Sequence, residues 1–255
     1  MNTGVPLLSI ITVVYNNLDG LQFTFQSLQK QTCKDYEWLV IDGGSTDGTV
    51  EWLDHLDFSG LTFISEKDKG LYDAMNKGLQ MASGLYVWFI NSGDGIYSEN
   101  IVKQLLEIKN SPDVIYGETM LIDERGNEIG TRSDKTTRKL PLKLSAKSMI
   151  KGMVVCHQSF ISKRDIAPLY NLFYTFSADI DWVISCLEKA SLVYNINSIL
   201  SNYLIGGISV QNQKTGWKER WNIYVVHYGF LYTAFAHVYI VIRYMWKNLF
   251  FNKKY

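Results

Sequence analysis

The chain has few cysteines and no excess of charge of either sign. Its 255 residues include 3 cysteines, and Lys plus Arg number 25, as do Asp plus Glu. Cys33, Cys156 and Cys186 lie far apart, without the spacing of a metal or redox motif, and an odd count is typical of a reducing compartment. We therefore expect three buried structural thiols. The balanced charge argues against nucleic acid and other polyanionic polymers as partners.

Other signals are missing as well. No basic segment precedes the first apolar run, so no signal peptide is expected. No internal repeat or low-complexity linker divides the chain, and no Gly-x-Gly-x-x-Gly fingerprint follows the first expected strand, residues 7–15. With 47% hydrophobic and 20% charged residues, the composition is that of a globular protein with a large core.

Apolar runs alternate with amphipathic segments in the first hundred residues. The pattern predicts strands over 7–15, 37–41, 61–64 and 85–90, and helices over 21–31, 50–56 and 72–81. Strands that alternate with helices form a parallel sheet covered on both faces, because the crossover connections are right-handed. The sequence therefore predicts an α/β fold.

The pattern is less regular beyond residue 100. We expect a hairpin over 119–131, a mobile basic loop over the site at 135–151, a strand-like segment at 154–160 and a helix over 177–189. The economical division is a domain of residues 1–212 and an aromatic, basic, helical tail of residues 213–255.

The tail leaves three interpretations open. Residues 221–242 contain no Lys, Arg, Asp or Glu and are long enough to cross a bilayer. Asn222, His227, Gly229 and His237 interrupt this run and disfavour a lipid-exposed span. Aromatic residues flanked by basic ones suit helices at the membrane interface, so peripheral membrane contact through residues 217–255 is favoured. Packing against the domain or a partner chain is the other alternative.

Small polar and acidic residues follow three of the expected strands, at 16–17, 42–47 and 91–94. The carboxyl ends of parallel strands lie at one edge of a sheet, where ligands bind in open α/β folds. Two of these segments combine carboxylates with glycine turns, which can hold a diphosphate through a divalent metal. The segment 42–47 alone is also typical of an ordinary turn.

Four segments, taken in order, resemble family 2 glycosyltransferases. They are SIITVVYN (9–16), VIDGGSTDGT (40–49), EKDKGLYDAMNKG (66–78) and NSGD (91–94). The resemblance implies a GT-A fold, with a Rossmann-like, mostly parallel central sheet flanked by helices, and transfer of a sugar from a nucleotide donor with inversion. The chain is most similar to bacterial enzymes that assemble capsular, exopolysaccharide or O-antigen units. The implied partners are a nucleotide-sugar, a UDP-sugar before others, and a glycan or lipid-linked acceptor in the cytoplasm, at the inner face of the plasma membrane.

The resemblance also implies roles for particular residues. The positions that match the family's donor-binding residues are Thr12, Tyr15, Asn16, Asp42, Asp68, Asp73, Lys77, Ser92 and Gly93. Asp94 matches the last acid of the metal-binding triplet and, with diphosphate oxygens and water, would hold Mg²⁺ or Mn²⁺. Two acids are replaced in this chain. Gly43 stands where the family often has the acid that reads uracil, and Gly93 stands where the triplet has its earlier acid.

Three further positions are candidates. Asp179 matches the family's catalytic base and Asp181 is the second choice, while the alternative for both is a helix-dipole role. His157 is either a core residue or a group beside the diphosphate or metal. Residues 206–209 resemble a flexible loop that closes on the donor, and the alternative for them is an ordinary turn.

Two other functions compete with sugar transfer. A non-catalytic subunit that binds a sugar nucleotide or a glycan within an assembly complex is the runner-up, and it is supported by Gly43 and Gly93. A nucleotidyltransferase is the third, but such an enzyme would carry a basic, glycine-rich loop after its first strand. Residues 16–19, Asn-Asn-Leu-Asp, are not such a loop.

Overall fold

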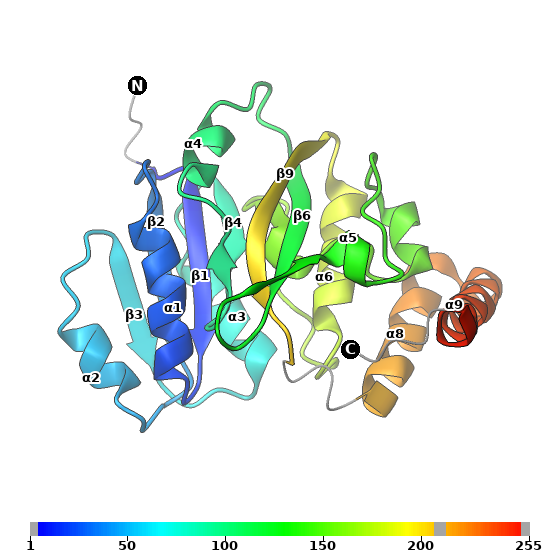
Figure 1. The fold of residues 1–255 in the computed structure, drawn as a ribbon, viewed down its shortest axis with the longest axis horizontal. Coiled ribbons are helices and arrows are strands. Elements are labelled where there is room, and N and C mark those ends of the chain that lie inside the picture. Colours follow the sequence, from blue (N-terminus) through cyan, green and yellow to red (C-terminus); the bar gives the residue numbers. More distant parts are fainter. Residues whose placement is uncertain (1–4, 207–212, 251–255) are drawn as a thin grey trace.

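A computed structural model describes residues 5–206 and 213–250 of the chain (Figure 1). Within these residues one nine-stranded sheet has the order β3-β2-β1-β4-β8-β6-β9-β5, with β7 paired to β6. The strands are β1 (Leu8–Val14), β2 (Tyr36–Asp42), β3 (Leu61–Ser65), β4 (Tyr86–Phe89), β5 (Gly95–Ile96), β6 (Val114–Ile122), β7 (Glu128–Thr131), β8 (Phe160–Lys163) and β9 (Val193–Leu204).

Helices flank this sheet and extend beyond it (Figure 1). They are α1 (Leu18–Gln29), α2 (Thr49–Asp54), α3 (Leu71–Met81), α4 (Ile101–Leu106), α5 (Arg132–Lys135), α6 (Ala178–Lys189), α8 (Gln213–Tyr228) and α9 (Phe230–Phe250), with 3₁₀ turns η1 (Ala146–Lys151) and η2 (His157–Ser159). The strand and helix alternation predicted for residues 7–90 is confirmed, with ends that differ by a few residues.

The sheet has a parallel half and a mixed half. β3, β2, β1 and β4 run parallel, with Leu8 of β1 paired to Tyr36 of β2 and to Tyr86 of β4. β8 is antiparallel to both β4 and β6, whereas β6 and β9 are parallel. The three strands that were predicted to end at the site, β1, β2 and β4, therefore all belong to the parallel half.

β1 separates two hydrophobic clusters because its side chains alternate between the faces of the sheet. Leu8 and Ile10 pack with the helices α1, α2 and α4, and Ile11 and Val13 pack with α3 and α6. Every residue of β1 is buried, as expected for a central parallel strand covered on both sides. Figure 1 shows α1 in front of the sheet, where it covers the β1 and β2 region.

Two expectations for the later part of the chain are wrong. Residues 154–160 do not form a strand up to Phe160; a 3₁₀ turn comes first, and the strand β8 begins at Phe160. The segment 135–151 is not a free loop, because Met149 is buried in the core and the Tyr116 hydroxyl donates to the carbonyl oxygens of Pro141 and Leu142 (2.9 and 2.8 Å). The basic, Ser/Thr-rich composition of this segment is typical of a loop and gives no signal of these contacts. The hairpin over 119–131 is confirmed by the antiparallel pairing of β6 and β7.

The first tail helix, α8, packs on the domain. Ile223 and Tyr224 are fully buried, and the Tyr224 hydroxyl donates to the Met149 carbonyl oxygen (2.8 Å). The Glu219 carboxylate accepts hydrogen bonds from the backbone N–H groups of Thr175 and Phe176 (2.8 and 2.9 Å). For α8, the alternative that the tail packs against the domain is therefore correct. The expected domain boundary, between 212 and 213, borders residues 207–212, which lie outside the described part.

No helix within residues 5–206 and 213–250 is long and apolar enough to cross a membrane. The three cysteines are free, with Cys156 and Cys186 buried as expected and Cys33 half-buried.

Candidate active site

The loops that follow β1 and β2 are tied together by side-chain hydrogen bonds. The Asn16 N–H donates to Ser45 Oγ (2.7 Å), and the Thr46 N–H donates to Asn16 Oδ1 (2.8 Å). The Leu18 N–H donates to Asp47 Oδ2 (2.9 Å). Asn16 has a φ of 47°, a left-handed conformation that asparagine tolerates better than most residues. Asn16 and Asp47 thus tie the loop after β1 to the loop after β2.

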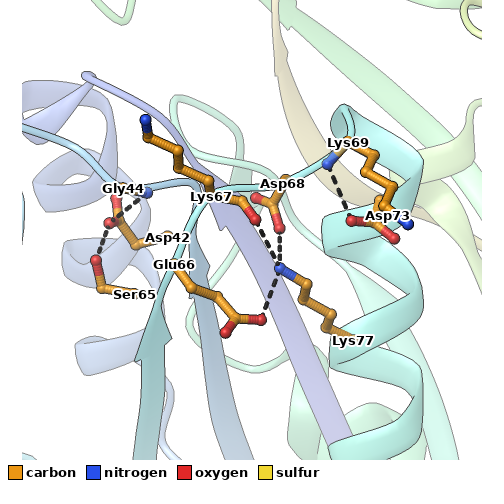
Figure 2. Close-up of polar contacts among 9 residues, drawn as sticks. All are labelled: Asp42, Gly44, Ser65, Glu66, Lys67, Asp68, Lys69, Asp73 and Lys77. Carbon is orange, nitrogen blue, oxygen red and sulfur yellow. Dashed lines mark hydrogen bonds and ion pairs between the residues drawn. The ribbon is translucent and has the colours of Figure 1, made fainter.

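Asp42 ends β2 with a fully buried carboxylate (Figure 2). Its Oδ2 accepts hydrogen bonds from the N–H groups of Gly44 and Ser45 (3.0 and 2.9 Å) and from Ser65 Oγ (2.6 Å). Its Oδ1 is buried and has no hydrogen-bond partner among the described residues. A buried acceptor without a donor is costly, so this oxygen is suited to a donor supplied by a ligand.

Thr12 and Tyr15 take different positions, although both were expected to contact the nucleoside. Thr12 is fully buried, and its hydroxyl donates to the Ile90 carbonyl oxygen (2.7 Å) and accepts from Trp38 Nε1 (2.9 Å). The structure therefore places Thr12 in the core beneath the site. The Tyr15 ring is 66% exposed at the edge of the sheet and can contact a ligand.

Asp68 and Lys77 form an ion pair beside this edge (Figure 2). Lys77 Nζ contacts Asp68 Oδ1 and also Glu66 Oε1 (2.8 Å). Burial raises the pKa of Asp68, although Lys77 opposes this effect. Asp73 accepts a hydrogen bond from the Lys69 N–H (3.0 Å) at the start of α3. Asp73 and Lys77 thus order the segment 66–78, while Asp68 lies toward the site.

Asp94 lies after β4, as predicted, and is 5% exposed. Its carboxylate accepts hydrogen bonds from Gln158 Nε2 (2.9 Å) and the Leu204 N–H (3.0 Å). Burial raises its pKa to about 7 despite these bonds. Gly93 precedes it with a φ of 96°, and Ser92 Oγ donates to the Asn17 carbonyl oxygen (3.0 Å). Ser92 and Gly93 therefore shape the turn that presents Asp94.

The Asp94 carboxylate can ligate a divalent metal ion. Each carboxylate oxygen has a second lone pair, so the two hydrogen bonds leave acceptor capacity for a cation. Across the described residues, no three His, Cys, Asp or Glu side chains form a group that could hold a metal ion. The site fits an ion with one protein carboxylate, completed by diphosphate oxygens and water, as Mg²⁺ accepts.

His157 lies in an aromatic cluster instead of at a metal ligand position. Its ring packs against Phe89, Tyr170 and Trp182, with ring centroids 5.1 to 5.9 Å apart, and its Nε2 contacts the Tyr170 hydroxyl (2.7 Å). Burial lowers its pKa to about 3, so the ring is neutral. These contacts favour the core interpretation. The adjacent Gln158 is the residue that contacts Asp94.

Asp179 and Asp181 both lie in the first turn of α6 but have different partners. Asp179 is half-buried and accepts a hydrogen bond from the Tyr72 hydroxyl (3.3 Å), and Tyr72 belongs to α3. Burial raises the pKa of Asp179, whereas the Arg220 guanidinium of α8 lowers it. Asp181 accepts from His227 Nε2 (2.8 Å) if this nitrogen carries the proton. Asp181 is therefore engaged by the tail helix.

Three neighbours of these acids were not predicted from the sequence: Tyr72, Arg220 and His227. No local pattern marks them, because Arg220 and His227 belong to α8, which begins 24 residues after the end of α6. The loop expected over residues 206–209 lies almost entirely outside the described residues, and Gly206 ends the described segment.

Known proteins support this picture. A family model described as Glycosyl transferase family 2 matches residues 9–167. An uncharacterized glycosyltransferase of Mycobacterium tuberculosis is 32% identical over 196 residues, which cover 75% of this chain and 71% of that protein. A PGL/p-HBAD biosynthesis glycosyltransferase of Mycobacterium bovis is 29% identical over 219 residues, covering 81% and 80%.

Solved structures support the same fold. TarS residues 1–349 of S. aureus, in complex with UDP-GlcNAc, matches with a TM-score of 0.66 at 16% identity, covering 95% of this chain and 73% of that one. The mannosyltransferase PcManGT of Pyrobaculum calidifontis, in complex with GDP-Man and Mn²⁺, matches with a TM-score of 0.63 at 13% identity, covering 97% and 76%. The predicted GT-A fold is confirmed. Because the family model spans more than half of the chain, including β1 to β4 and all three polar strand ends, the chain belongs to glycosyl transferase family 2.

Proposed function

We propose that this glycosyltransferase moves a sugar from a nucleotide-sugar, a UDP-sugar before others, to the hydroxyl of a glycan or lipid-linked acceptor, with inversion. The observation that carries the proposal is the arrangement of three acids. Asp42 ends β2 and Asp94 follows β4 at the same sheet edge, and Tyr72 links α3 of the same half to Asp179. The name of the mycobacterial relative refers to PGL/p-HBAD biosynthesis, which supports a glycolipid acceptor.

The two ends of the donor would meet different groups. Asp42 Oδ1 has no donor among the described residues, and the exposed Tyr15 ring lies nearby, which suits the nucleoside. Asp94, on the other side of β1, would hold Mg²⁺ or Mn²⁺ together with the diphosphate. When bound, the cation supplies positive charge that stabilises the departing diphosphate. Asp94 must ionise for this role, and its hydrogen bonds from Gln158 and Leu204 favour the ionised form.

Asp179 is the proposed general base. Its carboxylate takes the proton of the acceptor hydroxyl while the acceptor oxygen bonds to the anomeric carbon and the bond from this carbon to the diphosphate oxygen breaks. One displacement inverts the anomeric carbon and needs no covalent enzyme intermediate. Asp181 is less suited, because His227 already engages its carboxylate (2.8 Å).

The proposal is tested by the release of nucleoside diphosphate from UDP-, GDP- and dTDP-sugars with Mn²⁺ or Mg²⁺. We expect release from one donor, and its loss in Asp94→Ala. The control is Asp57→Ala, since Asp57 is exposed on the loop after α2. A different outcome would support the non-catalytic subunit: no donor releases nucleoside diphosphate, but the native chain and Asp94→Ala both bind the nucleotide without a metal ion.

We also propose that α9 lies on a membrane surface, where a lipid-linked acceptor would be presented. The proposal is supported by the large hydrophobic side chains that α9 exposes, which are Phe230, Leu231, Tyr232, Phe235, Val238, Tyr239, Val241, Ile242 and Met245. Exposed apolar patches of this kind mark interaction surfaces, and aromatic side chains settle at the membrane interface.

A further inference from the structure

The backbone at Gly43 leaves a space that a neighbouring carboxylate fills. A Cβ atom placed on Gly43 would lie 3.1 Å from Asp68 Oδ2 and 3.3 Å from Tyr15 Cδ2. The Gly43 N–H donates to the Val14 carbonyl oxygen (2.9 Å), so this backbone is fixed beside β1. Gly43 is not among the residues with positive φ, so its conformation permits a side chain. A side chain at position 43 is therefore opposed by the Asp68 carboxylate and not by backbone strain.

Lys77 holds Asp68 in this position (Figure 2). The Asp68 side chain is only 10% exposed, and Lys77 Nζ contacts its Oδ1. Oδ2, the oxygen nearer to Gly43, accepts no hydrogen bond from any of the described residues. The pair therefore presents one free carboxylate oxygen beside an exposed aromatic ring, which can stack on a planar ligand.

The position of this oxygen points to the nucleobase. In the proposed function the reacting atoms lie near Asp94 and Asp179, at the β4 side of β1. Gly43 and Asp68 follow β2 and β3, on the other side of β1. An extended donor with its diphosphate near Asp94 would therefore direct its base toward Gly43, Tyr15 and Asp68.

We propose, on the basis of the proposed function, that Asp68 reads the nucleobase in place of the acid missing at position 43 and selects uracil. A carboxylate oxygen accepts a hydrogen bond and donates none. Uracil offers one N–H, at N3, which suits a single free oxygen. Guanine would use both carboxylate oxygens, for N1–H and the N2 amino group, and its amino group would have to share Oδ1 with the Lys77 ammonium. Cytosine presents an unprotonated N3, which the carboxylate repels.

A set of four chains tests this assignment: the native chain, Asp68→Ala, Gly43→Asp and the double variant Gly43→Asp/Asp68→Ala. Calorimetry measures the Kd of UDP, GDP and CDP for each. A hydrogen bond to a charged group contributes about 1.5–3 kcal/mol, so we expect Asp68→Ala to weaken UDP about 10- to 100-fold. Gly43→Asp alone also weakens UDP, because its carboxylate would crowd Asp68. The double variant recovers UDP affinity to within about threefold of native.

Two further variants separate base reading from a structural role. Glu66→Ala removes the more exposed partner of the same lysine, and it leaves the ratio of the UDP and CDP affinities unchanged. Asp68→Asn exchanges an acceptor for an amide that also donates, and it shifts the affinity ratio toward CDP. A merely structural role of Asp68 would weaken all three nucleotides equally.

The outcomes distinguish this inference from the proposed function. If the native chain transfers sugar from a UDP donor but Asp68→Ala binds UDP as tightly as native, the base assignment is wrong and the transferase function stands. A double variant no better than Asp68→Ala would also overturn the assignment. If the native chain binds no nucleotide, both proposals fail.

Discussion

At the scale of single residues, partners decide what each acid can do. Asp179 and Asp181 occupy the same helical turn, yet Asp179 contacts a tyrosine hydroxyl while Asp181 contacts His227. Asp42 and Asp47 are five residues apart, yet Asp42 has a buried oxygen without a partner among the described residues while Asp47 Oδ1 accepts from the Thr49 hydroxyl (2.6 Å). Asp179 and Asp42 are therefore the members of each pair suited to a substrate.

Asp179→Asn should lower turnover about 10²- to 10⁴-fold, because general base catalysis contributes factors of this size. The donor Kd should change little, since the change removes a charge without altering the size of the side chain and leaves Asp42 and Asp94 in place. Initial rates and UDP calorimetry measure the two effects. Asp181→Asn is the matched control from the same turn, and a larger loss in that variant would transfer the role of base to Asp181.

The pH profile tests the same residue through Arg220. A base must be ionised, and burial raises the pKa of Asp179, so this residue should contribute a rise of kcat/KM with pH through a midpoint above the ordinary Asp value of about 4, in addition to the rise from Asp94, whose pKa is about 7. Arg220 lowers this pKa, so Arg220→Met should move the midpoint to higher pH. Lys218→Met, from an exposed position of α8, should leave it in place. An unmoved midpoint in Arg220→Met would show that another group controls the profile.

The acids at strand ends were predictable because a buried strand is an apolar run and the polar residues after it must lie at the sheet edge. Asp42 and Asp94 follow this rule. The partners of these acids were not predictable. Gln158 approaches Asp94 only because β8 inserts next to β4, and Thr12 is buried because its neighbours Trp38 and Ile90 engage its hydroxyl.

At the scale of elements, α3 is seated closely on the sheet through a glycine. A Cβ atom on Gly78 would lie 2.4 Å from Ile11 Cγ2 of β1, closer than atoms can pack. The helix carries Tyr72, Asp73 and Lys77, so its seating positions part of the site. The contact explains why glycine occupies the middle of this helix, where it disfavours helix formation.

Gly78→Ala should destabilise the protein by about 1–3 kcal/mol, because overpacking forces either α3 or Ile11 to move. Gly216→Ala is the matched control. Its Cβ would lie 3.6 Å from Ser177 Oγ, an ordinary contact. We therefore expect this variant to be as stable as the native chain or more stable by up to about 1 kcal/mol. Urea unfolding measures both. If the Gly78→Ala variant is as stable as the Gly216→Ala variant, Ile11 adjusts to the added methyl group without a cost in stability.

The elements themselves were predictable to different degrees along the chain. In the first half, β1, β2 and β3 are each followed by a helix, so local patterns predict these elements and the handedness of the crossovers restricts the sheet order. After β5 the connections are irregular, and contacts between residues far apart in the sequence determine where these segments lie. Tyr116 anchors the segment 135–151, and Tyr224 anchors η1, but neither contact has a local signal.

The contact of α8 with α6 should depend on pH through His227. Burial opposes protonation, but hydrogen bonds to Asp181 and Glu188 raise the pKa of His227 above its ordinary 6.5. A raised histidine pKa adds stability below about pH 6.5, which is lost as pH rises through the folded-state value. His227→Gln should therefore cost about 1 kcal/mol at pH 6 and less at pH 9, by urea unfolding.

The control for this pH dependence is His55→Gln, since His55 lies exposed at the end of α2. It should change stability by a similar, small amount at both pH values. A cost of His227→Gln that grows toward pH 9 would contradict the assigned ion pairs.

At the scale of the whole molecule, the site and the α9 surface lie apart. The acids and the exposed Tyr15 lie at the carboxyl ends of the parallel strands, whereas α9, which exposes large hydrophobic side chains from Phe230 to Met245, lies at the opposite side of the molecule from β3 (Figure 1). α8 lies between them and contacts both α6 and α9. A membrane bound by α9 would therefore be connected to the proposed base through a single packed helix.

Flotation with liposomes tests this arrangement in the full chain. Leu231 and Phe235 are 71% and 76% exposed and lie four residues apart, on one side of α9. Burying such a side chain contributes about 1.5–3 kcal/mol, so Leu231→Glu/Phe235→Glu should lower the fraction that floats with phosphatidylglycerol vesicles about tenfold or more. Leu142→Glu is the control, since Leu142 is 84% exposed on another segment. Turnover of a soluble acceptor should survive in both. If the α9 variant floats as well as the native chain, α9 is not the membrane contact, and its apolar face then covers a protein surface.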